Sequence, residues 1–257
     1  YDGSGTGLVS CLPPWSAADG KQYANISDPD VRPKILSEMR NEDAEWENRG
    51  LNVGPENIIV ADLRHPDTIQ YRGWRLSAIA ADLGLDWPET VLHLLEKEQH
   101  RTFTMYLGMS EDNIRQQVQQ PWIKFSTDAG GFDPATVAEF GPTHPRSYGT
   151  YTRVIGRFVR DYGWLTLEDA IRKCSSSVAD RLGLRDRGML RDGMKADVIV
   201  FDPETVNDVS TYVDPHRLSV GVRDVFVNGT AVLRNNEHAG AFPGQRVHGP
   251  GYKKVSA

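Results

Sequence analysis

The spacing of apolar and polar residues changes several times along the chain, and each change predicts an element. Residues 76–84 (LSAIAADLG) carry apolar side chains at helical spacing and end in a glycine, which is typical of a helix C-terminus. A second helix is predicted over 86–98, because Asp86 suits a helix cap and Pro88 suits the first turn. Residues 102–108 (TFTMYLG) alternate in the manner of a strand.

The same patterns predict further elements before residue 184. They are a helix over 31–46, a short buried strand over 57–63, a helix from Ser110 to about 119, a strand over 123–128, a helix around 151–162, and a helix capped by Thr166 that runs to about 183. Strands that alternate with helices favour an α/β fold with a parallel sheet.

The pattern changes again after about Arg185, where helical spacing stops. Residues 195–202 (KADVIVFD) predict a strand, and 225–233 (VFVNGTAVL) place two apolar runs around Asn228-Gly229. Asn-Gly between apolar runs is the strongest short-range hairpin signal. We therefore predict a boundary near Gly183 and a small β unit over 184–257.

Asp128 stands at the end of the predicted strand 123–128 and is followed by Gly130 and Gly131. Alternation along a strand places Lys124, Ser126 and Asp128 on one face. A polar face suits the inside of a closed barrel better than an open parallel sheet, which is covered by apolar layers on both sides. In barrels the C-terminal strand ends form the active site. Asp128 is therefore either a catalytic carboxylate or a turn cap, and the pattern leaves both open.

Composition narrows the classes of function. The chain has 257 residues with a net charge of −6, which gives no basic patch for nucleic acid or an anionic membrane surface. Apolar runs stay short of the roughly 18 residues that span a bilayer. Cys11 and Cys174 are too few for a disulfide framework, so we expect a reducing, cytoplasmic setting. Because the chain opens on YDGSGTGL without a methionine, we expect it to begin within a larger protein.

Four stretches together resemble the C-terminal part of the N-acyl-D-amino-acid deacylases (D-aminoacylases), which belong to the metal-dependent amidohydrolase superfamily. They are WIKFSTDAGG (122–131), the run from THPRSYGT to SVADRLGL (143–184), RGMLRDGMKADVIVFDPETVND (187–208) and DVFVNGTAVLRNNEHAGAFPGQ (224–245). The resemblance is close over about 118–248 and looser over 1–15. HPRSYGT and ADVIVFD are specific only in combination.

The resemblance implies a (β/α)8 TIM-like barrel with a small β-sandwich domain. This chain would supply the C-terminal part of the barrel over 1–183, with an insertion at about 9–110, and the β-sandwich over 184–257. A complete barrel needs on the order of 250 residues, so residues 1–183 could provide only its last strands.

The resemblance also implies a function, which is metal-dependent hydrolysis of the amide bond of N-acyl-D-amino acids to a carboxylate and an amino acid. Asp128 matches the aspartate that handles the proton of the metal-activated water, and it is also a weak candidate for a metal ligand. Arg146 matches the arginine that binds the substrate carboxylate, and Tyr1 matches a tyrosine that lines the substrate site. Zn²⁺ is the expected cofactor of the complete enzyme, since it acidifies bound water and polarises a carbonyl.

Departures from the family pattern leave alternatives open. The family's other metal ligands would precede Tyr1, and none of the seven histidines fits them. We therefore expect the missing N-terminal region of the same enzyme to be a partner, and the isolated chain not to hold the metal. Gly5 stands where the family has a serine, and His144 is either a turn residue or a substrate-site group. The rival hypotheses are a truncated or non-catalytic remnant and a cyclic amidase of the hydantoinase or dihydroorotase kind.

Overall fold

The computed structural model of the protein describes residues 1–137, 139 and 141–253, and they form two compact units. The first consists of Tyr1–Glu111, Phe132–Pro145 and Thr211–His216, and the second of Asp112–Gly131, Arg146–Ser210 and Arg217–Ala257. The predicted domains of this chain, the C-terminal part of a barrel over 1–183 and a small β-sandwich over 184–257, stay a prediction. Within the described residues, every helix is too short or too polar to cross a membrane.

The first unit contains a three-stranded sheet. Its strands are β1 (Ser4–Gly7), β2 (Ile58–Val60) and β3 (Phe103–Tyr106), and β3 lies in the centre. Met105 of β3 is opposite Gly5 on one side and Ile59 on the other, and both pairings are antiparallel. The expected parallel pairing is therefore wrong here. Two helices, α4 and α5, separate β2 from β3, so the chain returns in the opposite direction, whereas a parallel crossover typically uses one.

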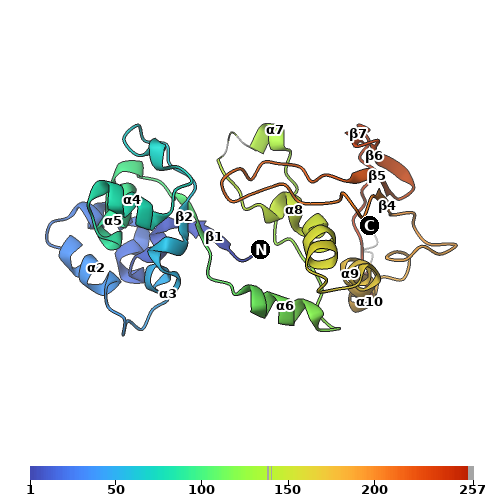
Figure 1. The fold of residues 1–257 in the computed structure, drawn as a ribbon, viewed down its shortest axis with the longest axis horizontal. Helices are drawn as coiled ribbons and strands as arrows, with labels where there is room; N and C mark the ends of the chain where they lie inside the picture. The colour runs from blue at the N-terminus through green and yellow to red at the C-terminus, as the bar shows by residue number, and fades with distance from the viewer. Residues whose placement is uncertain (138, 140, 254–257) are drawn as a thin grey trace. The chain divides into compact units, whose positions relative to one another are not determined.

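The first unit also contains helices, of which α2 to α5 lie beside the sheet in Figure 1. They are α1 (Gln22–Ser27), α2 (Arg32–Met39), α3 (Arg49–Val53), α4 (Leu76–Leu83), α5 (Trp87–Glu98) and α7 (Pro134–Val137), with short 3₁₀ turns η1 (Leu8–Cys11), η2 (Pro14–Gly20), η3 (Pro55–Asn57) and η4 (Ile69–Tyr71). The caps follow the prediction, because the Asp86 side chain accepts from the Glu89 backbone and Gly84 is left-handed at φ 65°. Helix α2 ends before the predicted residue 46, since Asn41 accepts from the Asp43 backbone in a turn.

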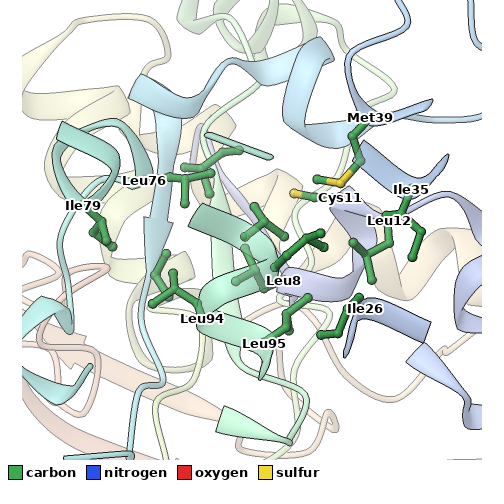
Figure 2. Close-up of a cluster of buried hydrophobic side chains, with 14 of the residues drawn as sticks. Leu8, Cys11, Leu12, Ile26, Ile35, Met39, Leu76, Ile79, Leu94 and Leu95 are labelled. Atoms are coloured by element: carbon green, nitrogen blue, oxygen red, sulfur yellow. The ribbon is translucent and has the colours of Figure 1, made fainter. Parts of the chain in front are cut away.

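The core of the first unit lies between these helices and the sheet. Figure 2 shows Leu94 and Leu95 of α5 close to Leu8 of η1, and Leu76 and Ile79 of α4 beside them. All five are fully buried. Burial of each such side chain stabilises the folded state by roughly 1.5–3 kcal/mol, so this core supports the unit's fold.

The second unit contains a run of helices. They are α6 (Glu111–Gln119), which starts at the unit boundary, α8 (Arg146–Arg153), its continuation η6 (Val154–Asp161), α9 (Leu167–Cys174) and α10 (Ser176–Leu182). Segment η6 is wound as a π-helix. Thr166 caps α9 as predicted, with its side chain accepting from the Asp169 backbone. Val154 and Phe158 of η6 pack with Ala170 of α9 in a small apolar cluster.

A four-stranded antiparallel sheet completes the second unit. Its strands β4 (Val198–Phe201), β5 (Val222–Val227), β6 (Thr230–Arg234) and β7 (Glu237–His238) lie in that order (Figure 1). Asn228 and Gly229 both have positive φ, 49° and 81°, as a type I′ hairpin turn requires. Over the described residues 184–253 the chain forms strands and loops without a helix, as predicted for the β unit. Residues 254–257 lie outside the described part.

The predicted strand 123–128 is wrong. This stretch is irregular, and within the described chain no strand pairs with it. Ile123 instead donates its backbone N–H back to Gln120, and Phe125 packs against the apolar cluster of η6 and α9. Asp128 has φ 46°, a left-handed conformation that ends an extended run. A strand needs a hydrogen-bonding neighbour, and local alternation cannot reveal whether one is present.

Candidate active site

Two of the three predicted site residues lie side by side in the second unit. Arg146 is the first residue of α8, directly after Pro145, and Asp128 lies in the loop after α6. The Arg146 Nη2 is 2.8 Å from the Asp128 Oδ2. The two residues are 18 positions apart in the sequence, and the fold brings the carboxylate to the guanidinium.

The pair is open to solvent. The Asp128 side chain is 86% exposed and that of Arg146 is 32% exposed. Asp is one of the few residues other than Gly that adopts left-handed φ readily, because its short polar side chain can hydrogen-bond locally. A Cβ on Gly131 would meet nothing within 4 Å, so this glycine leaves open space rather than making a close packing contact.

The chemistry of the pair follows from its atoms. A carboxylate has about four acceptor positions, and a guanidinium has five N–H donors in a planar fork. The observed contact uses Oδ2 of Asp128, on a side chain that is largely exposed. The arrangement therefore presents a proton acceptor next to a cationic fork of the kind that binds carboxylates.

Tyr1, the third predicted residue, belongs to the first unit. Its hydroxyl donates to the Pro145 carbonyl at 3.3 Å, and its ring meets the edges of His144 and Tyr212 at centroid distances of 5.4 and 6.1 Å. His144 is buried, and its Nε2 is 2.9 Å from the Gly3 carbonyl. His144 thus contacts the residue directly before β1. This contact favours a structural role for His144 over a role in substrate binding.

Tyr212 is the member of this aromatic cluster that the sequence did not indicate. Its hydroxyl donates to Asp2 Oδ1 at 2.8 Å and accepts from the Gly3 backbone at 2.8 Å. Tyr212 lies in a loop without periodicity, more than 200 residues from its partners, so nothing local marks it. Gly5, on β1, stands where a Cβ would lie 2.6 Å from the Phe103 ring, so this position does not accommodate a serine without a shift of that ring.

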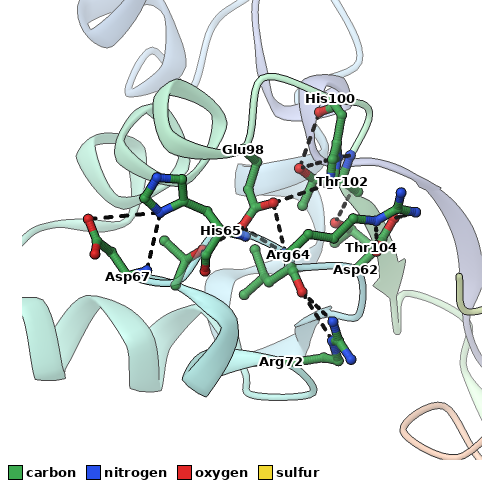
Figure 3. A network of polar contacts seen from close by, with 11 residues as sticks. Asp62, Arg64, His65, Asp67, Arg72, Glu98, His100, Thr102 and Thr104 are labelled. Carbon is green, nitrogen blue, oxygen red and sulfur yellow. Dashed lines mark hydrogen bonds and ion pairs between the residues drawn. The ribbon is translucent and has the colours of Figure 1, made fainter.

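A second polar cluster surrounds Glu98, whose side chain is fully buried in the first unit (Figure 3). Its carboxylate accepts from the backbone N–H groups of Arg64, at 2.9 Å, and His65, at 3.1 Å, and from the Thr68 hydroxyl. His100 Nε2 lies 3.2 Å from Oε2. Both carboxylate oxygens are occupied by protein groups, so this cluster ties the 62–68 loop to the end of α5 rather than presenting a site for a ligand.

The side chains that could bind a metal ion are scattered over the described part of the chain. In residues 1–137, 139 and 141–253, no three His, Cys, Asp or Glu side chains lie together in a way that could hold a metal ion. Burial raises the pKa of the Cys11 and Cys174 thiols to about 12, which disfavours the thiolate that a metal binds. The donor groups described in this chain therefore do not fit a metal site by themselves.

Comparison with known proteins identifies the segment that carries Asp128 and Arg146. Residues 126–233 match the amidohydrolase family. We call residues 126–233 the amidohydrolase segment because of this similarity. The amidohydrolase segment contains the Asp128–Arg146 pair, α8 to α10 and the hairpin of β5 and β6.

Relatives cover more of the chain than the amidohydrolase segment alone. The N-acyl-D-aspartate deacylase of Alcaligenes xylosoxydans xylosoxydans is 34% identical over 179 residues, which is 70% of this chain and 33% of that protein. The N-acyl-D-glutamate deacylase of the same organism is 37% identical over 161 residues, 63% of this chain and 30% of that protein. The chain thus spans about a third of the length of these relatives.

Solved structures agree with this relationship. The N-acyl-D-glutamate deacylase from Bordetella bronchiseptica, complexed with zinc and a phosphonate mimic of the tetrahedral intermediate, aligns with a TM-score of 0.58 and 31% identity over 72% of this chain and 36% of that chain. A D-aminoacylase structure aligns with a TM-score of 0.57 and 29% identity, over 71% of this chain and 35% of that one. The α/β character of the chain is consistent with this family.

Proposed function

We propose that this chain supplies the C-terminal part of a metal-dependent deacylase that hydrolyses the amide bond of N-acyl-D-amino acids. The observation that carries the proposal is the Asp128–Arg146 pair inside the amidohydrolase segment. Relatives named for N-acyl-D-aspartate, N-acyl-D-glutamate and D-amino-acid deacylation support the substrate class. All of these substrates share a free carboxylate beside the scissile amide.

Arg146 and Asp128 would have different roles in the reaction. Arg146 would bind the substrate carboxylate through its planar fork, which matches two carboxylate oxygens at once. Asp128 would accept a proton from the attacking water through Oδ1 and return it to the departing amine, while Oδ2 stays near Arg146. One anchored end of the substrate would thereby place the amide at the base. Tyr1 would line the substrate site.

The rest of the enzyme must provide what the described residues do not. The Asp128 side chain is open to water, whereas general acid–base chemistry works best in a site that excludes it. Zinc in the Bordetella relative supports a metal cofactor, and its ligands would come from outside the residues described here. We accordingly propose the family's barrel and β-sandwich for the complete protein, with 184–257 in the sandwich.

The test is a substrate panel on the purified full-length protein. The panel pairs N-acetyl-D-glutamate with its L-enantiomer, with an analogue whose free carboxylates are amides, and with a hydantoin. We expect hydrolysis of the D-acid and much slower turnover of the amide analogue. Preferential hydrolysis of the hydantoin would favour the cyclic-amidase alternative. Metal-loaded, folded protein that hydrolyses none of the panel would favour a non-catalytic role.

A further inference from the structure

One side of the long helix α8–η6 contacts a loop of the second unit, residues 203–208. Arg153, Gly156 and Arg160 lie along this helix at intervals of three and four residues. Each of the three meets the segment 203–208. Arg146, the proposed carboxylate-binding residue, begins this helix two turns before Arg153.

The contact is centred on a buried ion pair. Arg153 Nη1 lies 3.1 Å from Asp208 Oδ2, with the Arg153 side chain 11% exposed and that of Asp208 2% exposed. Gly156 brings the backbones together, since a Cβ there would lie 2.6 Å from Asn207 Oδ1 and 2.7 Å from the Val206 carbonyl. Breaking a buried pair leaves an uncompensated charge, so this contact resists displacement.

Further hydrogen bonds extend the contact in both directions along the helix. Arg160 Nη1 donates to the Val206 carbonyl at 2.8 Å. Ser219 Oγ donates to the Tyr148 carbonyl at 2.9 Å and lies 2.6 Å from Thr152 Oγ1. Asn207 and Val220 are joined by two backbone hydrogen bonds, which tie the 203–208 segment to the Ser219 segment. Helix α8 is therefore held along its length by one connected loop structure.

We propose that Arg153, through Asp208, is a positioning residue that fixes helix α8 and thereby holds Arg146 where it meets Asp128 and the substrate carboxylate. This inference rests on the proposed function for the identity of the ligand. The Arg153–Asp208 pair would thereby contribute to specificity for a free carboxylate without contacting the substrate.

The experiment uses Arg153→Met, Arg153→Lys and Gly156→Ala in the full-length protein. Gly156→Ala separates helix and loop without a change of charge. The matched control is Arg172→Met, which removes a half-exposed pair with Asp169 on the neighbouring helix α9 and a hydrogen bond to the Pro121 carbonyl, and leaves the 203–208 segment untouched. Two readouts are taken, namely hydrogen exchange of peptides covering 146–153, and kcat and KM for N-acetyl-D-glutamate and its amide analogue.

We expect faster exchange over 146–153 in Arg153→Met and Gly156→Ala, partial recovery in Arg153→Lys, and no change in the control. Displacement of about 1 Å can cost 10²-fold, so kcat/KM for the acid should fall by about 10–100-fold. The loss should be mainly in KM, and turnover of the amide analogue should change little. Equal losses for both substrates, or unchanged exchange over 146–153, would overturn the inference. If the parent protein hydrolyses neither substrate, the proposed function fails, and hydrogen exchange alone decides whether Arg153 holds α8.

Discussion

Replacement of Glu98 by alanine tests the account of the first unit most severely. Glu98 ends α5 with a fully buried side chain, and its carboxylate is the acceptor for the backbone N–H groups of Arg64 and His65 and for the Thr68 hydroxyl (Figure 3). Alanine removes the acceptor and leaves those three donors in place. The backbone N–H groups of Arg64 and His65 must then stay without an acceptor or become exposed to water.

The expected loss in the free energy of unfolding follows from the number of donors left without an acceptor. A buried donor left unsatisfied costs about 1–3 kcal/mol. Three donors, two of which belong to partly exposed residues that water can reach, give a loss of about 3–6 kcal/mol in the free energy of unfolding. At a urea slope of about 2 kcal/mol/M, the midpoint should fall by about 1.5–3 M. Glu98→Gln keeps one acceptor oxygen and should lose less.

Urea denaturation followed by tryptophan fluorescence measures this, and Glu96→Ala is the matched control. Glu96 lies on the same helix but is exposed, with a 3.5 Å contact to Arg32, so its loss should cost about 0–1 kcal/mol. If Glu98→Ala and Glu96→Ala shift the midpoint equally, the buried carboxylate is not what ties the 62–68 loop to α5.

Three further predictions concern the second unit, the cysteines and the metal. Arg146→Lys in the full-length protein should raise KM for N-acetyl-D-glutamate by several-fold, since an ammonium lacks the planar fork. An equal rise of KM for the amide analogue would mean that the role of Arg146 is structural. Burial raises the pKa of Cys11 and Cys174 to about 12, so the unfolded chain loses these thiol protons near pH 9 while the folded chain keeps them. Stability should therefore be fully present below pH 9 and decline toward pH 12, and Cys11→Ala/Cys174→Ala should flatten that decline in denaturation curves. The 257-residue chain by itself should bind Zn²⁺ weakly or not at all, because the described residues bring no three metal-binding side chains together. Elemental analysis that finds stoichiometric, chelator-resistant zinc would contradict this prediction.

Local signals in the sequence predicted those elements whose cause is local. Asp86 and Thr166 cap helices through their own side chains, Gly84 ends a helix in a left-handed conformation, and Asn228-Gly229 closes a hairpin. Each of these depends on a few neighbouring residues, so pattern and residue type were enough to locate it.

Features set by distant partners could not be predicted in this way. The alternation over 123–128 indicated a strand, but no neighbouring strand pairs with it in the described chain, and Asp128 turned left-handed instead. Asp208 and Tyr212 lie in loops without periodicity, and their roles depend on partners 55 and up to 210 residues away. The roles of Asp128 and Arg146 were implied only through resemblance to a family, and nothing in the sequence indicated that their side chains would meet.

The most direct test of the account is Asp128→Asn in the full-length protein, assayed with N-acetyl-D-glutamate at saturating concentration. Asparagine keeps the size of the side chain and can still lie beside Arg146, but it cannot accept the proton. General acid–base catalysis contributes about 10²–10⁴-fold, so kcat should fall by at least that range while KM changes little. A variant that is folded and retains near-normal kcat would contradict the assignment of Asp128 as the base and leave it as a turn residue paired with Arg146.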